Sequence, residues 1–160
     1  MNPGKIEVAS SRGIYVIKLS GDVRLNLCSS LERYVDDMFE SKEFKTVLID
    51  LSEAEGVDST TLGQLAKISI LCRENHGLVP SIITPREDIT RILLSMGFDK
   101  VFYLIGEVPA HISELDELRC DQVGEDEMKA KVIEAHKILM SLNEHNREAF
   151  SELVDSLEGK

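Results

Sequence analysis

The segment 47-VLIDL-51 constrains the fold of this chain more than any other, because it is short, apolar and flanked by charged residues. Such a segment is typical of a strand that is buried on both faces, as in parallel sheets covered by helices. Segments with helical periodicity alternate with strand-like segments on both sides of it. This alternation predicts an α/β domain.

The other strand-like segments are rich in apolar or β-branched residues and are bordered by turn residues. The first two, residues 6–9 and 14–19, are expected to form a hairpin across the turn-prone residues 10–13. Pro80 indicates that the third begins irregularly or lies at an edge. The four segments are residues 6–9, 14–19, 78–83 and 101–105.

Three helices are expected between these strands. Ser29 and Glu32 have the spacing of a capping box, ahead of an apolar stripe at helical spacing. Thr84, Pro85 and Glu87 form the clearest helix start, with Thr84 as the N-cap. Glycines end the second and third helices, at positions 77 and 97. The resulting order is β-β-α-β-α-β-α-β, an α/β sandwich with a mixed sheet of four or five strands and helices on one side.

Residues 107–160 differ in composition and predict an acidic helical extension to a domain of residues 1–106. Residues 106–160 hold 14 Asp and Glu against 6 Lys and Arg, a charge of 6 − 14 = −8. Steps of four and three between mostly apolar residues indicate a heptad seam with a polar core position, Asn146. The extension either packs on its own domain or mediates a homodimer, and residues 143–148 are polar enough to form a turn. The seam residues are Met128, Val132, Ala135, Leu139, Leu142, Asn146, Ala149 and Leu153.

The composition excludes several classes of partner. A net charge of −11 argues against nucleic acid or an anionic membrane. The sequence has no apolar run of bilayer-spanning length and no signal-peptide pattern, so a cytoplasmic location is expected. The three cysteines are far apart and are expected to be reduced, with Cys28 and Cys72 on apolar helix faces. The histidines and carboxylates show no metal-ligand spacing, so neither a metal nor a cofactor is expected.

A cluster of one acid and three hydroxyl residues, Asp58-Ser59-Thr60-Thr61, stands between the central strand and a helical segment. Helix capping explains part of it: Thr61 and Gln64 have capping-box spacing, and Asp58 or Ser59 would cap one turn earlier. Three hydroxyls exceed what one helix end needs. A helix N-terminus also favours an added phosphate, which would bring about two negative charges. Capping alone and modification both remain open from the local chemistry.

The element order, 47-VLIDLSEAEGVDSTTLGQLAKI-68 and 97-GFDKVFYL-104 resemble the STAS domain, the fold of the bacterial anti-sigma factor antagonists. That family has a strand ending in Asp-Leu-Ser, a short loop, and Asp-Ser-Ser/Thr at a helix start. Asp50-Leu51-Ser52 and Asp58-Ser59-Thr60 match this pattern, and the resemblance covers about residues 4–107. Thr61 stands where the family usually has glycine.

The resemblance implies a phosphorylation-switched protein-binding regulator. In its unphosphorylated form such a protein sequesters an anti-sigma factor, often itself a serine kinase, and a sigma factor is released. The kinase would phosphorylate Ser59, with Thr60 as second candidate, and a serine phosphatase would reverse the reaction. The partner-binding residues implied are Asp22, Asp58, Ser59, Thr60, Thr61, Leu62 and Gly63.

Two other functions are compatible with the sequence. One is a non-switching STAS subunit of a signalling or transport complex, in which Ser59 only caps the helix. The other is a dimeric scaffold that functions through its C-terminal helix. Enzymatic activity is not expected, because His76, the histidine nearest to Ser59 in sequence, falls at the far end of the same predicted helix.

Overall fold

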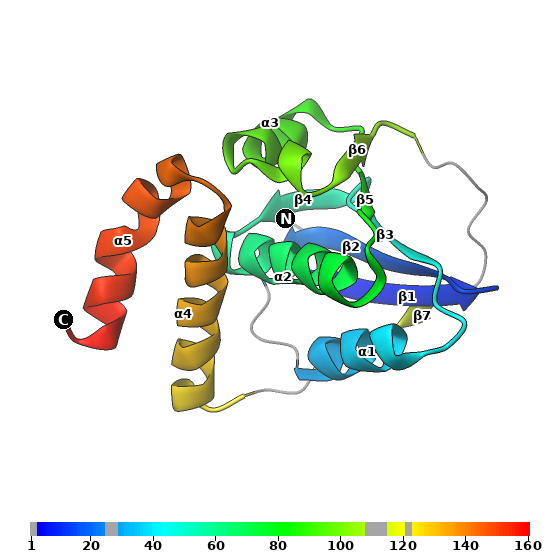
Figure 1. Ribbon diagram of the computed structural model, residues 1–160, viewed down its shortest axis with the longest axis horizontal. Coiled ribbons are helices and arrows are strands. Elements are labelled where there is room, and N and C mark those ends of the chain that lie inside the picture. Colours follow the sequence, from blue (N-terminus) through cyan, green and yellow to red (C-terminus); the bar gives the residue numbers. More distant parts are fainter. Residues whose placement is uncertain (1–2, 25–28, 108–114, 121–122) are drawn as a thin grey trace.

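The computed structural model describes residues 3–24, 29–107, 115–120 and 123–160, which form an α/β domain and two C-terminal helices (Figure 1). The elements in chain order are β1 (Lys5–Ser11), β2 (Ile14–Val23), α1 (Ser29–Glu40), β3 (Thr46–Asp50), β4 (Ala54–Val57), α2 (Ser59–His76), β5 (Ser81–Ile83), α3 (Glu87–Ser95), the 3-10 helix η1 (Phe98–Lys100), β6 (Tyr103–Ile105), β7 (Asp116–Glu117), α4 (Glu125–Leu142) and α5 (Glu144–Glu158).

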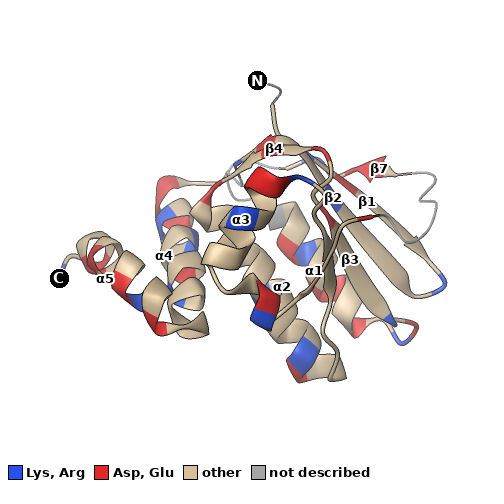
Figure 2. Cartoon of the chain, turned by 90° about the horizontal axis from the view of Figure 1, so that it is seen from above, with Lys and Arg blue, Asp and Glu red and all other residues tan. Residues whose placement is uncertain are grey.

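The sheet is mixed, with the strand order β6-β5-β3-β2-β1-β7 and β4 paired to the end of β2. Strands β2 to β6 pair in parallel, whereas β1 is antiparallel to both β2 and β7. The segment predicted as the central strand is β3, between β2 and β5. Helices α1, α2 and α3 lie on one side of the sheet (Figure 2). The predicted fold class is thereby confirmed.

Among the described residues the sheet has seven strands rather than the four or five expected. Strand β4 was not predicted, because four residues, Ala-Glu-Gly-Val, carry too little alternation. It pairs with β2 across a register shift at Gly21 and Asp22. Strand β7 lies in the acidic region where no strand was expected. It consists of two exposed acidic residues at the sheet edge, where pairing needs no apolar pattern.

The core lies between the sheet and its three helices. Its fully buried side chains include Ile17 and Ile49 from the sheet and Leu65 from α2. Helix α2 is buried on several sides over its first two turns, from Thr61 to Ala66, because α4 covers the part of it that the sheet and α1 leave free.

The expected start of α3 at Thr84 is wrong. The helix begins at Glu87, after an N-cap residue, Arg86, that makes no side-chain capping bond. The N–H of Thr84 donates to the carbonyl of Ile105, which keeps the backbone of Thr84 extended beside β6. A residue that precedes proline also disfavours the helical conformation. The Ser29 side chain of the other expected capping box lies outside the described residues.

The C-terminal extension forms two helices that pack on their own domain. They meet at Asn143, within the polar stretch recognised as a possible turn. The buried side chain of Asn146 donates from Nδ2 to the carbonyls of Met96 (2.8 Å) and Leu139 (2.9 Å). Ala149 and Leu153 are exposed, so the heptad seam does not continue along α5. Asn146 therefore joins α5 to α4 and to the end of α3.

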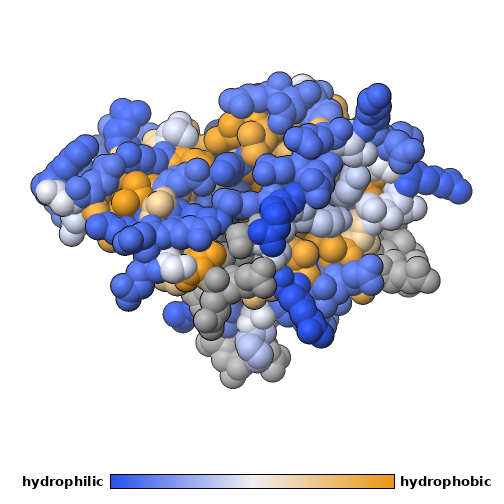
Figure 3. Space-filling model, turned by 90° about the horizontal axis from the view of Figure 1, so that it is seen from below, coloured by the Kyte–Doolittle hydropathy of each residue, from blue (hydrophilic) through white to orange (hydrophobic). Residues whose placement is uncertain are grey.

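The face of the molecule seen in Figure 3 is largely hydrophilic, with separate apolar patches. Within the described part of the chain, no helix is long and apolar enough to cross a membrane. The same residues contain no group of three or more His, Cys, Asp or Glu side chains that would hold a metal ion.

The cysteines differ in oxidation state. Cys120 is disulfide-bonded, which corrects the expectation of reduced thiols, because sequence separation says nothing about proximity in the fold. Cys72 is a free thiol, fully buried as expected. Cys28 lies outside the described residues.

Alkylation of Cys72 in the native protein is expected to be at least about a hundredfold slower than in the urea-unfolded chain. Burial raises the pKa of the Cys72 thiol, which lowers the fraction of reactive thiolate, and the fold excludes the reagent. Mass spectrometry after timed exposure to iodoacetamide measures both rates on the same peptide. Equal rates in the two states would contradict the buried position.

Candidate functional site

The start of α2 is capped by Asp58. Its Oδ1 accepts a hydrogen bond from the backbone N–H of Thr61 at 2.8 Å, and its own backbone is extended. Thr61 is thus the third residue of the helix, and Asp58 performs the capping that the sequence also allowed for Thr61 and Gln64. Ser59 is the first residue of the helix, and its side chain is half-buried.

The end of β2 lies beside this helix start. The carbonyl of Val23 accepts hydrogen bonds from the N–H of Asp58 and from Oγ1 of Thr61, each at 3.4 Å. Asp22 pairs with Gly56 of β4 and accepts a hydrogen bond from Arg24 at 3.0 Å. The structure therefore brings the predicted residues of β2 and α2 together.

Three of the predicted partner-binding residues are buried in this arrangement: Thr61, Leu62 and Gly63. Leu62 belongs to the domain core. The Thr61 side chain points inward to Val23, so a threonine in place of the family glycine adds no bulk at the surface. Thr60 is half-buried, like Ser59.

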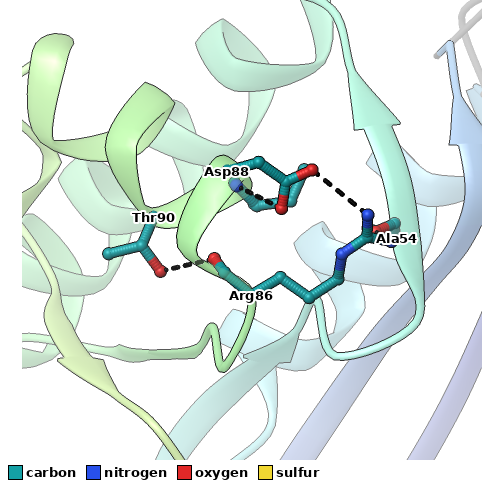
Figure 4. A network of polar contacts seen from close by, with 5 residues as sticks. Ala54, Arg86, Asp88 and Thr90 are labelled. Atoms are coloured by element: carbon teal, nitrogen blue, oxygen red, sulfur yellow. Dashed lines mark hydrogen bonds and ion pairs between the residues drawn. The ribbon is translucent and has the colours of Figure 1, made fainter.

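Strand β4, which leads directly into Asp58, is fixed by Arg86 (Figure 4). The guanidinium of Arg86 donates from Nη1 to the carbonyl of Ala54 (2.9 Å) and pairs through Nη2 with Asp88 (3.1 Å). The hydroxyl of Thr90 donates to the carbonyl of Arg86 at 2.9 Å. These contacts tie the start of α3 to the start of β4.

An unexpected histidine contacts Ser59. Nε2 of His136, on α4, lies 2.8 Å from Oγ of Ser59, and Nδ1 of His136 lies 2.7 Å from the carbonyl oxygen of Val132. A carbonyl only accepts, so Nδ1 carries a hydrogen. In the neutral ring Nε2 then accepts the hydroxyl hydrogen of Ser59. The Nδ1 partner is a carbonyl rather than a carboxylate, so the pair lacks the third member of a Ser-His-Asp triad.

The sequence does not predict the contact between His136 and Ser59, because His76 is the histidine nearest to Ser59 in sequence. His76 instead bonds the carbonyl of Phe39, near the other end of α2. His136 is 2% exposed and lies edge-on to Phe150, with ring centroids 5.0 Å apart. Its position beside Ala135, within the apolar seam, was the one available signal that it faces inward.

Helix α4 crosses the start of α2 at close range (Figure 1). A Cβ atom at Gly63 would lie 2.3 Å from the carbonyl oxygen of Ala135, so only glycine allows this approach. Ion pairs flank the crossing. Lys67 of α2 pairs with Glu134 at 3.0 Å, and Lys131 pairs with Glu32 of α1 at 2.7 Å.

A family model described as "Mlab, STAS domain" matches residues 6–106, so the chain belongs to the STAS domain family. The fold is similar to the crystal structure of an anti-sigma factor antagonist from Mycobacterium paratuberculosis, with a TM-score of 0.53 and 23% sequence identity. That match covers 66% of this chain and 88% of the other. Helices α4 and α5 follow the end of the family model.

Proposed function

We propose that this protein is a cytoplasmic anti-sigma factor antagonist controlled by phosphorylation of Ser59. The observation that carries the proposal is the position of Ser59 at the first turn of α2, directly after its N-cap Asp58, in a STAS domain. The similar Mycobacterium paratuberculosis protein is itself an anti-sigma factor antagonist, which supports the same class of regulator. In the proposed cycle, a serine kinase that is also the anti-sigma factor modifies Ser59, and a serine phosphatase restores it.

Partner binding would use the side chains of the site that are not fully buried: Asp22, Asp58, Ser59 and Thr60. A phosphate on Ser59 would add about two negative charges beside the carboxylates of Asp58 and Asp22. Such a cluster repels an acidic partner surface and obstructs a closely packed one. The unphosphorylated protein is therefore the form proposed to bind.

Incubation with the cognate serine kinase and ATP is expected to add one phosphate to the wild-type protein and to the Thr60→Ala variant, and none to Ser59→Ala. Intact-mass and peptide mass spectrometry measure the modification. Thr60→Ala is the matched control, since it removes the neighbouring hydroxyl and leaves the Asp58 cap in place. Equal modification of Ser59→Ala would contradict the assignment of the site.

Ser59→Asp is expected to weaken capture of the anti-sigma factor in a pull-down with purified proteins. Undiminished capture would favour the second candidate function, a non-switching STAS subunit of a signalling or transport complex. The hydrogen bond from Ser59 to His136 supports that alternative, because the hydroxyl then has a structural role. A homodimer formed through the extension would use seam residues that remain exposed, such as Met128 and Leu153.

A further inference from the structure

We infer that a phosphate on Ser59 and the docked position of the tail, defined as residues 125–158 of α4 and α5, exclude each other. Phosphorylation then releases the tail, and the docked tail shields Ser59 from modification. The modification belongs to the proposed function, on which this inference rests. The exclusion itself follows from the contacts between α2 and α4.

The first contact is the hydrogen bond from Ser59 to His136. Phosphorylation replaces the hydroxyl hydrogen by a phosphorus atom with three further oxygens, so the neutral imidazole loses its donor. The added atoms must also fit beside a side chain that is 2% exposed and 2.8 Å from Oγ. A dianion in this partly buried position loses part of its hydration, which is costly unless it gains a cation. The nearest cationic side chain on α2, Lys67, is already paired with Glu134.

The tail has no room to adjust by a small shift. At Gly63 the backbone of Ala135 lies so close that an added Cβ atom would be 2.3 Å from its carbonyl oxygen. Just past the C-terminal end of α4, Asn146 and Asn143 donate to the carbonyl of Met96, at 2.8 and 3.3 Å. Because α4 is fixed at Ala135 and at its C-terminal end, a group inserted at Ser59 displaces this part of α4 as a whole.

The two events are coupled in both directions. If the phosphate lowers the affinity of the tail for the domain by some factor, the docked tail lowers the tendency of Ser59 to carry phosphate by the same factor. The tail also covers Gly63 and its surroundings on α2, beside the surface proposed for the partner. Phosphorylation of Ser59 by a kinase is therefore expected to be faster when the tail is open.

The test uses the full chain with phosphoserine incorporated in place of Ser59 during synthesis, so that no kinase is required. Hydrogen–deuterium exchange is expected to be at least about tenfold faster for the backbone amides of α4 and α5 than in the unmodified protein. Phosphoserine in place of Ser10, an exposed residue of β1, is the matched control and should leave the tail protected. Ser59→Ala should also keep the tail docked, because the alanine adds no charge or bulk.

Unchanged or increased protection of α4 in the Ser59 phosphoprotein would overturn the inference. Increased protection would mean that His136 binds the phosphate as a cation and holds the tail. The proposed function fails separately, if the cognate kinase leaves Ser59 unmodified or if Ser59→Asp binds the anti-sigma factor normally. Either result is distinguishable from tail release in the synthetic phosphoprotein.

Discussion

Substitution of Gly63 by alanine is expected to detach helix α4 from helix α2. The added Cβ would lie 2.3 Å from the carbonyl oxygen of Ala135 and 2.6 Å from its Cα, and backbone atoms cannot rotate away as a side chain can. Overpacking of this kind costs about 1–3 kcal/mol or more. Helix propensity alone has the opposite sign, because alanine stabilises a helix interior by about 1 kcal/mol over glycine. A loss of stability in Gly63→Ala would therefore show that overpacking against α4 outweighs helix propensity, and a gain would show the reverse.

Limited digestion with trypsin measures the detachment, because Lys131 and Lys137 lie within α4. Cleavage there is expected to become much faster in Gly63→Ala. Gly106→Ala is the matched control, since its methyl group enters open space and leaves the tail in place. A more stable Gly63→Ala protein with unchanged cleavage would show that α4 does not approach Gly63 so closely.

Phe98→Ala is expected to lower the free energy of unfolding of the domain by about 3–5 kcal/mol. Phe98 is completely buried and stacks on Phe102, with ring centroids 5.5 Å apart. Its removal leaves a cavity under η1, next to the turn at Met96 and Gly97 where the tail is anchored. This packing gives a structural role to Phe98 in the segment 97-GFDKVFYL-104, which is one of the two that resemble the STAS domain.

Urea denaturation followed by circular dichroism measures this loss. Phe98→Leu is the matched control and is expected to cost clearly less, because it keeps most of the buried apolar volume. A loss below about 1 kcal/mol in Phe98→Ala would fall outside the range for a buried phenylalanine and would contradict this position.

Most of the domain could be predicted from the sequence because its signals are local. The strands around residues 14–19 and 47–51 and the helix ending at Gly77 depend on periodicity and terminators within a few residues. Strand β4 and the late start of α3 could not be predicted this way. Both depend on pairing with distant segments, β2 in one case and Ile105 of β6 in the other.

The same distinction applies to the site. Asp58 and Ser59 were identified because the capping and family patterns are contiguous in sequence. His136 was not, because 77 residues separate it from Ser59 and its contact arises only when α4 folds back. The burial of Gly63 likewise depends on packing against α4 that residue types alone do not specify.

Covalent attachment of the tail has a kinetic consequence. Asn143 ends α4 and caps α5, so α4 lies between the linker from β7 and an anchor at Met96. After opening, α4 returns to α2 in an intramolecular reaction, at an effective concentration on the order of millimolar. A soluble competitor for this surface of α2 must therefore bind tightly enough to outcompete a ligand that dilution does not remove.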